Sequence, residues 1–169
     1  MITRSTLNLI YDYHYWITRR LLAACEALTP EQWTHSHGHS WDSVHGLVTH
    51  MLTAEIIWLA RWQGVSPTTL RRKEELPTLA DVRREWAVVE SDVRAFLAAC
   101  NDPRLNQPLT YTNTRGEQFT VILGQLMLHL ANHGTHHRGE LVAMLALLER
   151  PHPEDDLLWY LLEQRPKSA

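Results

Sequence analysis

The stretch VILGQLMLHLANHGTHHRGELVAMLALL, residues 121–148, decides the fold. Apolar side chains recur in it every three or four residues, which predicts one long amphipathic helix. At about 100° per residue, His137 falls inside the apolar stripe and His133 at its edge. His129 and His136 flank the stripe. The helix is therefore expected to present two imidazoles, one turn apart, to the interior of the protein.

The rest of the chain has the same helical periodicity. It predicts further long helices over residues 3–27, 40–64 and 79–100, and short helices over residues 29–33 and 157–164. Ser40 or Asp42 is the expected cap of the second long helix, and Gly64 its stop. Residues 101–120 contain two prolines and a turn-like NTRG, which indicates an extended loop or a small hairpin. The expected fold is all-α: a four-helix bundle in a single domain spanning 1–169, with long connections and room for one short hairpin before the last long helix.

The composition is that of a soluble globular domain, with 44% hydrophobic and 21% charged residues and a net charge of −3 over 169 residues. No basic tract indicates nucleic acid as a partner. No apolar run is long enough for a bilayer span and no signal-peptide cleavage site is visible, so we expect no membrane partner and a cytoplasmic location. Cys25 and Cys100 are isolated and are expected to be small apolar fillers, and Trp58, Trp62 and Trp86 fall at helical spacing typical of core packing.

His133 and His137 have the spacing that lets two imidazoles on one helix bind one metal ion. A hydrogen-bonded pair of core histidines is the alternative, although each imidazole then needs partners for both nitrogens. A third ligand must come from another helix. His50 lies on a mostly apolar face and is the best candidate, with His14 on the first helix as the main competitor. Four further histidines are not expected to be ligands: His45, which points away from His50, and the loop residues His35, His37 and His39.

Three segments in a fixed order carry a resemblance to a known family. They are YDYHYWITRRLL (11–22), VHGLVTHMLTAEIIWLARWQG (44–64) and LMLHLANHGTHHRGELVAML (126–145), with NHGTHHRGE (132–140) as the strongest part. Together with YTNTRGEQFT (111–120) and PEDDLLWYLLE (153–163), they resemble the DinB-like (DinB/YfiT) family of metalloenzymes over nearly the whole chain.

This resemblance implies a four-helix bundle, often a homodimer, that holds a divalent metal ion, usually zinc or nickel, with three histidines. By position these match His50, His133 and His137. Some members of the family are thiol-dependent S-transferases that use mycothiol or bacillithiol, and related maleylpyruvate isomerases act with thiol cofactors.

Three imidazoles leave coordination positions open for a small-molecule substrate. The expected function is a metal-dependent S-transferase that activates a low-molecular-weight thiol, which needs no nucleophile from the protein. The alternatives are a metal-dependent hydrolase that uses a metal-bound water, and a non-catalytic metal-binding stress-response protein. Four groups are expected to support the site: Asn132, Glu140, Arg138 as the anchor of an acidic substrate, and Glu55 to orient a ligand.

Overall fold

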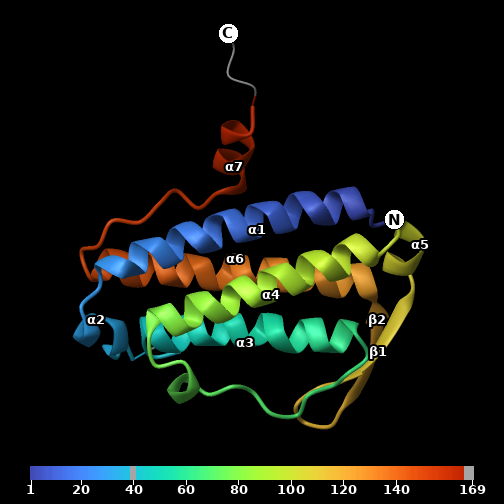
Figure 1. Cartoon of the computed structure of the whole chain (residues 1–169), viewed down its shortest axis with the longest axis horizontal. Helices are drawn as coiled ribbons and strands as arrows, with labels where there is room; N and C mark the ends of the chain where they lie inside the picture. The colour runs from blue at the N-terminus through green and yellow to red at the C-terminus, as the bar shows by residue number, and fades with distance from the viewer. Residues whose placement is uncertain (39–40, 166–169) are drawn as a thin grey trace.

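The computed structural model describes residues 1–38 and 41–165. The chain is mostly helical and carries one small antiparallel sheet (Figure 1). Four long helices make up the body of the molecule: α1 (Arg4–Ala24), α3 (Val44–Trp62), α4 (Leu79–Ala99) and α6 (Leu123–Leu147). α1 packs against α6 and α4, and α3 packs against the same two helices. The prediction of a mostly helical fold is confirmed.

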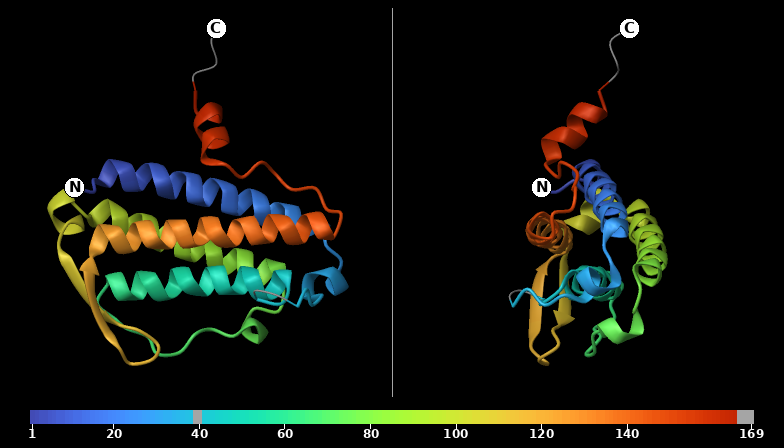
Figure 2. Two further views of the ribbon diagram at one scale, coloured as in Figure 1. Left: turned by 180° about the vertical axis from the view of Figure 1, so that it is seen from behind. Right: turned by 90° about the vertical axis from the view of Figure 1, so that its left-hand side faces the viewer.

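The direction of the long helices explains the long connection between the second and third of them. α1 and α6 run one way, whereas α3 and α4 both run the other way (Figures 1 and 2). Because two consecutive helices that point the same way cannot be joined by a tight turn, residues 63–78 run back along α3 before α4 begins. This returning segment covers one side of α3.

Short elements fill the remaining connections. They are the 3-10 turns η1 (Cys25–Ala27) and η2 (Lys73–Glu75), the helices α2 (Pro30–Thr34), α5 (Asp102–Leu105) and α7 (Leu157–Glu163), and the strands β1 (Pro108–Thr112) and β2 (Gln118–Ile122). The strands pair with Thr110 opposite Thr120 and form the hairpin expected before the last long helix. α7 projects away from the long helices (Figure 2).

The expected boundaries need two corrections. α3 is capped by the side chain of Ser43, which accepts from the Gly46 amide, and not by Asp42, whose φ of 71° places it in the left-handed region outside the helix. Ser40, the other expected cap, lies outside the described residues. At the other end Gly64 has a φ of 87° and follows the helix as predicted. α6 begins at Leu123 because the two preceding residues still belong to β2.

The tryptophans and cysteines that the sequence predicts to be core residues are buried or partly buried in the structure. Trp62 and Trp86 are buried, and Trp58 is partly buried against that core. Both cysteines are buried as well, and burial raises the pKa of the Cys25 thiol to about 12. A thiol with such a pKa stays protonated at neutral pH, in keeping with its expected role as an apolar filler.

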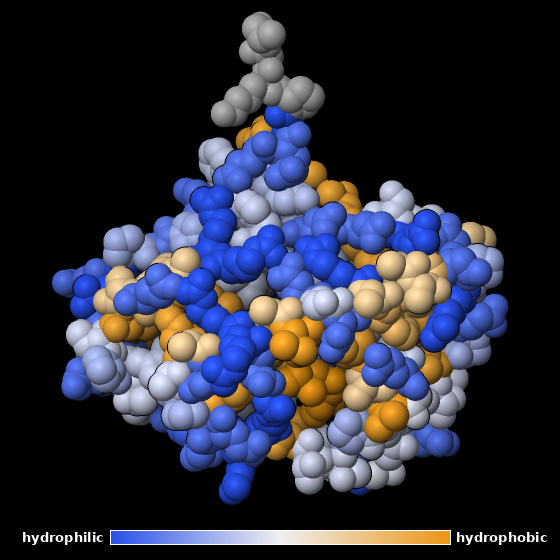
Figure 3. Space-filling model, viewed as in Figure 1, coloured by the Kyte–Doolittle hydropathy of each residue, from blue (hydrophilic) through white to orange (hydrophobic). Residues whose placement is uncertain are grey.

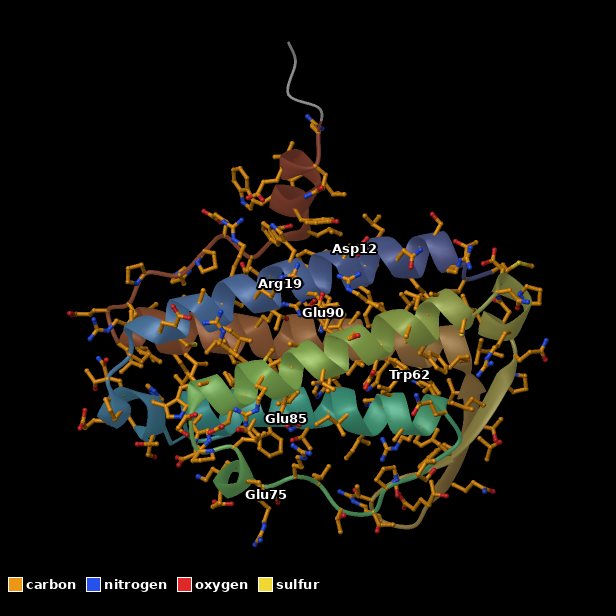
Figure 4. All side chains as sticks on the ribbon, in the orientation of Figure 1. Asp12, Arg19, Trp62, Glu75, Glu85 and Glu90 are labelled. Atoms are coloured by element: carbon orange, nitrogen blue, oxygen red, sulfur yellow. The ribbon has the colours of Figure 1, made fainter. Side chains whose placement is uncertain are left out.

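The surface is polar and charged around this core. α1 and α4 are joined by ion pairs, with Arg19 on Glu90 at 2.6 Å and Arg94 on Asp12 at 2.7 Å (Figure 4 labels Asp12, Arg19 and Glu90). On the face drawn in Figure 3, hydrophilic residues cover most of the surface and hydrophobic ones gather between α4 and α3. None of the described helices combines the length and apolar character needed to cross a membrane.

Candidate metal centre

The packing of α3 against α6 brings three histidines together. His50 comes from α3, and His133 and His137 come from successive turns of α6. The Nε2 atom of His50 lies 3.3 Å from that of His133 and 3.1 Å from that of His137, and the latter two are 3.1 Å apart. These are the three histidines expected from the sequence, and their nitrogens form a nearly equilateral triangle.

The size of the triangle suits a small divalent cation. Imidazole nitrogens lie about 2.0–2.1 Å from zinc, so two of them in a tetrahedral arrangement are about 3.3–3.4 Å apart. The observed separations of 3.1–3.3 Å are close to that value. The three nitrogens therefore already stand where a shared ion requires them.

The protonation of the rings favours an ion over mutual hydrogen bonds. Burial, followed by the neighbouring imidazoles, lowers the pKa of His50 to about 3 and that of His133 to about 4, so both are neutral at pH 7. The Nδ1 atom of His137 lies 2.6 Å from a carboxylate oxygen of Glu140 and donates to it, which leaves a lone pair on its Nε2. If His50 and His133 both donate from Nε2 to that lone pair, their two Nε2–H groups face each other at 3.3 Å, and neither of them can accept a hydrogen bond. A cation satisfies all three nitrogens at once.

Groups around the triangle hold the rings in place. Glu140 fixes the orientation of His137, as carboxylates commonly do for metal-binding histidines. The indole of Trp41 stacks on the His50 ring, with centroids 3.7 Å apart and planes 11° from parallel. Glu140 was expected to support the site, whereas the contribution of Trp41 was missed because the loop before α3 has no periodicity that predicts its path.

A second group of potential ligands shares one histidine with the first. It consists of His136, His137 and Glu140, all on α6, with His136 exposed. In this group the Nδ1 of His137 already donates to Glu140 at 2.6 Å, and His136 lies 3.5 Å from the same carboxylate. The first group draws on two helices and brings three imidazole nitrogens within 3.3 Å of one another, so it is the better candidate for a metal site. His129 belongs to neither group and packs its ring against Trp58.

Glu55 does not orient His50, which corrects the expectation from the sequence. Five residues along a helix correspond to about 140° of rotation, so the two side chains leave α3 in different directions. Glu55 is buried in the core and accepts hydrogen bonds from His14 at 2.8 Å, Tyr15 at 2.9 Å and Trp86 at 3.0 Å. His14, the competing candidate for third ligand, is thus engaged by this carboxylate.

Arg138 also points away from the three histidines. Its side chain is buried, and its guanidinium donates to Nδ1 of His14 at 2.9 Å and to the hydroxyl of Thr135 at 2.8 Å. Since Arg138 only donates, His14 accepts at Nδ1 and donates from Nε2 to Glu55. Its expected role as an anchor of an acidic substrate does not fit this position, because one residue beyond His137 the helix has turned by about 100°.

Gly134 allows this close contact between α1 and α6. A Cβ atom at this position would lie 2.6 Å from Cε1 of His14 and 2.8 Å from a guanidinium nitrogen of Arg138. A glycine inside a long helix was the one sequence signal of such a close approach. The network of Glu55, His14 and Arg138 therefore links α3, α1 and α6 beside the metal centre.

The other histidines and Asn132 lie elsewhere. Asn132 is exposed and lines a separate pocket between α1, α6 and the segment before α7, so it is not beside the triangle. His45 is buried, hydrogen-bonds to the Leu76 carbonyl at 2.8 Å and stacks on Trp33. His35 and His37 contact each other in the loop after α2, and His39 lies outside the described residues.

Comparison with known proteins shows the family to which the chain belongs. The sequence model of the DinB family matches residues 1–168. The protein DinB of Bacillus subtilis is 23% identical over 165 residues, which cover 95% of this chain and 96% of that protein. The crystal structure of a DinB-like protein from Bacillus cereus has a TM-score of 0.64 at 16% identity, and the match covers 86% of this chain and 94% of that one. The chain therefore belongs to the DinB family.

Proposed function

We propose that the protein is a metal-dependent S-transferase in which His50, His133 and His137 hold a divalent cation, zinc or nickel, that activates a low-molecular-weight thiol. The observation that carries the proposal is the triangle of Nε2 atoms at 3.1–3.3 Å. A divalent ion held by these atoms supplies Lewis acidity, which lowers the pKa of a thiol that binds to it.

The residues of the chain have defined parts in this reaction. The three imidazoles would present their Nε2 lone pairs to the ion, and Glu140 would orient His137 by accepting a hydrogen bond from its Nδ1. The thiol loses its proton to solvent, its sulfur forms a bond to an electrophilic carbon of the substrate, and the bond from that carbon to the leaving group breaks. Cys25 is buried and protonated, and it takes no part.

An open site supports a reaction over mere storage of the metal. Among residues 1–38 and 41–165 the cluster around His50 has three members, so an ion held by these imidazoles would keep a position for an exchangeable ligand. His50 also lines a pocket of about 450 Å³, which offers room for a small molecule beside that residue. A non-catalytic structural site is expected to be closed by a fourth protein ligand.

The bundle and the homodimer come from the family resemblance, whereas the single domain and the cytoplasmic location come from the length and composition of the sequence. We assign the four long helices to the DinB-like four-helix bundle as a single domain over 1–169, and we expect a cytoplasmic homodimer. The exposed apolar side chains of α7, Leu158, Trp159 and Leu161, are compatible with contact to a second copy.

A screen of thiol cofactors against electrophilic substrates, with and without chelator, tests the function. Metal-dependent loss of the thiol together with release of the leaving group is the expected result. Consumption of an ester or amide substrate without any thiol would instead identify a hydrolase, and no turnover of either kind by the metal-loaded protein would contradict an enzymatic role.

A further inference from the structure

A buried arginine lies in the last turn of α3. Arg61 is only 7% exposed, and among the described residues it forms no ion pair and donates no hydrogen bond. Arg138, which is also buried, donates to His14 and Thr135. Burial lowers the pKa of the Arg61 guanidinium, and the opposite influence comes from the phenol of Tyr111 and not from a carboxylate. Since buried charges in proteins are normally paired, this arrangement indicates that an anion binds to Arg61.

Two aromatic rings cover the flat faces of the Arg61 guanidinium. Its central carbon lies 4.7 Å from the ring centroid of Trp58 and 5.1 Å from that of Tyr111, a residue of β1. Such contacts use the faces of the group, whereas its N–H bonds point outward in its plane. Nε is sealed from solvent, but the terminal nitrogens are not, and within the described part of the chain they have no acceptor. The edge with these two nitrogens is therefore left for a ligand, and it suits a carboxylate.

The rings beside Arg61 continue to the metal centre. The hairpin lies beside the end of α3 and the start of α6 (Figure 1). The Trp58 ring lies 5.2 Å from that of His129, which lies 6.0 Å from the ring of His133. His129 is exposed, and Trp58 and Tyr111 are partly exposed, so this row of rings borders solvent. We call Trp58, Arg61, Tyr111 and His129 the Arg61 site.

Helix geometry sets the span between the Arg61 site and the metal centre. His50 and Arg61 are eleven residues apart, which corresponds to a rotation of about 20°, so they share one face of α3. The guanidinium reaches back over Trp58, whose position on the helix is about 12 Å from that of His50 along the axis. A molecule that touches both places must therefore be elongated, with its anionic group on the order of 10 Å from its reacting atom.

We propose that the Arg61 site binds the anionic end of the small molecule that reacts at the metal centre. The terminal nitrogens of Arg61 donate to a carboxylate, and the aromatic members of the site contact the apolar part between the two ends. The inference rests on the proposed function only in placing the reacting end at the metal. It gives Arg61 the role that the sequence suggested for Arg138, whose guanidinium is engaged by His14.

Removal of the charge separates a ligand site from an internal fastening. Arg61→Met keeps a long apolar side chain between the two rings and takes away an unpaired buried cation. Without ligand, the variant should therefore melt within about 2 °C of the parent or above it. If Arg61 only fastened the hairpin to α3, loss of both ring contacts should lower the Tm by about 4 °C or more.

Calorimetric titration of the zinc-loaded protein with 3-phenylpropionate measures recognition of the anion. Arg61→Met should raise the Kd about tenfold, as expected when charge-assisted hydrogen bonds are lost. Arg61→Lys, which keeps the charge but not the planar fork, should raise it about three- to fivefold. The neutral analogue 3-phenylpropan-1-ol should bind the parent about tenfold more weakly than the acid.

Arg104→Met is the matched control for this titration. The Arg104 guanidinium also lies over an aromatic ring, 5.3 Å from the centroid of Phe96, but it is exposed. Its loss changes the net charge equally and should leave the Kd unchanged. Equal effects of Arg61→Met and Arg104→Met on the Kd, or a lower Tm of Arg61→Met with an unchanged Kd, would overturn the proposal.

A long thiol separates this inference from the proposed function. In the cobalt-loaded protein, thiolate-to-cobalt absorption reports binding of sulfur to the metal. Extended 8-mercaptooctanoate holds its carboxylate about 10 Å from its sulfur. It should bind about five- to tenfold more tightly than 8-mercaptooctan-1-ol, and Arg61→Met should remove that difference.

The two ways of failing are distinguishable in these experiments. Absorption with equal affinities for the long acid and the long alcohol would refute the Arg61 site and leave thiol activation standing. Absence of the absorption with both thiols, together with the expected 3-phenylpropionate results, would refute thiol activation and leave the Arg61 site standing.

Discussion

Replacement of Glu55 should destabilise the protein in graded steps without removing the metal. The carboxylate is only 2% exposed and accepts three hydrogen bonds of 2.8–3.0 Å from His14, Trp86 and Tyr15. In Glu55→Ala all three donors lose their acceptor and Arg138 loses a nearby negative charge. The free energy of unfolding should therefore fall by about 3–5 kcal/mol. Glu55→Gln keeps one oxygen as acceptor for two of the donors, but the hydrogen bonds lose the strength that the negative charge gives them. Its free energy of unfolding should fall by about 2 kcal/mol.

Urea unfolding with chelator present measures this series, with Tyr15→Phe, expected to lose about 1 kcal/mol, as the single-bond reference. The Glu55→Gln loss corresponds to a decrease in Tm of about 4–8 °C for a chain of this size. A Glu55→Ala protein within about 1 kcal/mol of the parent would refute the network. A folded Glu55→Gln protein that no longer binds metal would instead show that Glu55 does orient His50.

Three further predictions concern the metal centre and its support. Gly134→Ala should destabilise the protein by about 1–3 kcal/mol in urea unfolding, because the new methyl group meets the buried imidazole of His14 at 2.6 Å. Gly139→Ala, where the new methyl group faces open space, should be neutral or stabilising by up to about 1 kcal/mol in the same assay. Glu140→Gln should weaken metal affinity about 10- to 100-fold in a chelator competition while stoichiometry is retained, and unchanged affinity would show that the carboxylate does not support His137. The folded pKa values of about 3 for His50 and about 4 for His133 lie below the unfolded value of 6.5, so the unfolded state binds more protons in acid. The metal-free protein should therefore be fully stabilised by these rings above about pH 6.5 and lose that stability as the pH falls toward about 4, and a flat urea-unfolding profile over this range would contradict the burial of neutral rings.

Regular helical geometry is what made the histidine cluster predictable from the sequence. The rotation of about 100° per residue places His133 and His137 on the buried side of α6, and it separates them from His129 and His136. The same arithmetic selected His50 only as one of two candidates. The choice between His50 and His14 depends on which helix faces α6 at that level, and periodicity within one helix does not contain that information.

The supporting residues were harder to predict because their partners are distant in the sequence. Glu55 and Arg138 were expected at the metal on the strength of their proximity in sequence to His50 and His137. Both helices have turned away by those positions, and the two side chains meet His14 of α1 instead. The start of α3 was misplaced for a local reason, since the left-handed backbone of Asp42 cannot belong to the helix.

The returning segment of residues 63–78 shows a further limit of periodicity. Its polar sequence predicted a connection but neither its path nor its contact with α3. Its path follows from the parallel directions of α3 and α4, which only the packing of the whole chain determines (Figure 1). Lys73 reaches the pocket beside His50 for this reason alone.

The metal content of purified variants tests the central claim most directly. Elemental analysis should find one divalent ion per chain in the parent protein and in His129→Ala and His136→Ala, whose rings lie outside the triangle. It should find little or none in His50→Ala and His137→Ala, because two imidazoles do not hold the ion against dialysis. Full metal content in both His50→Ala and His137→Ala, with the fold intact by circular dichroism, would contradict the account.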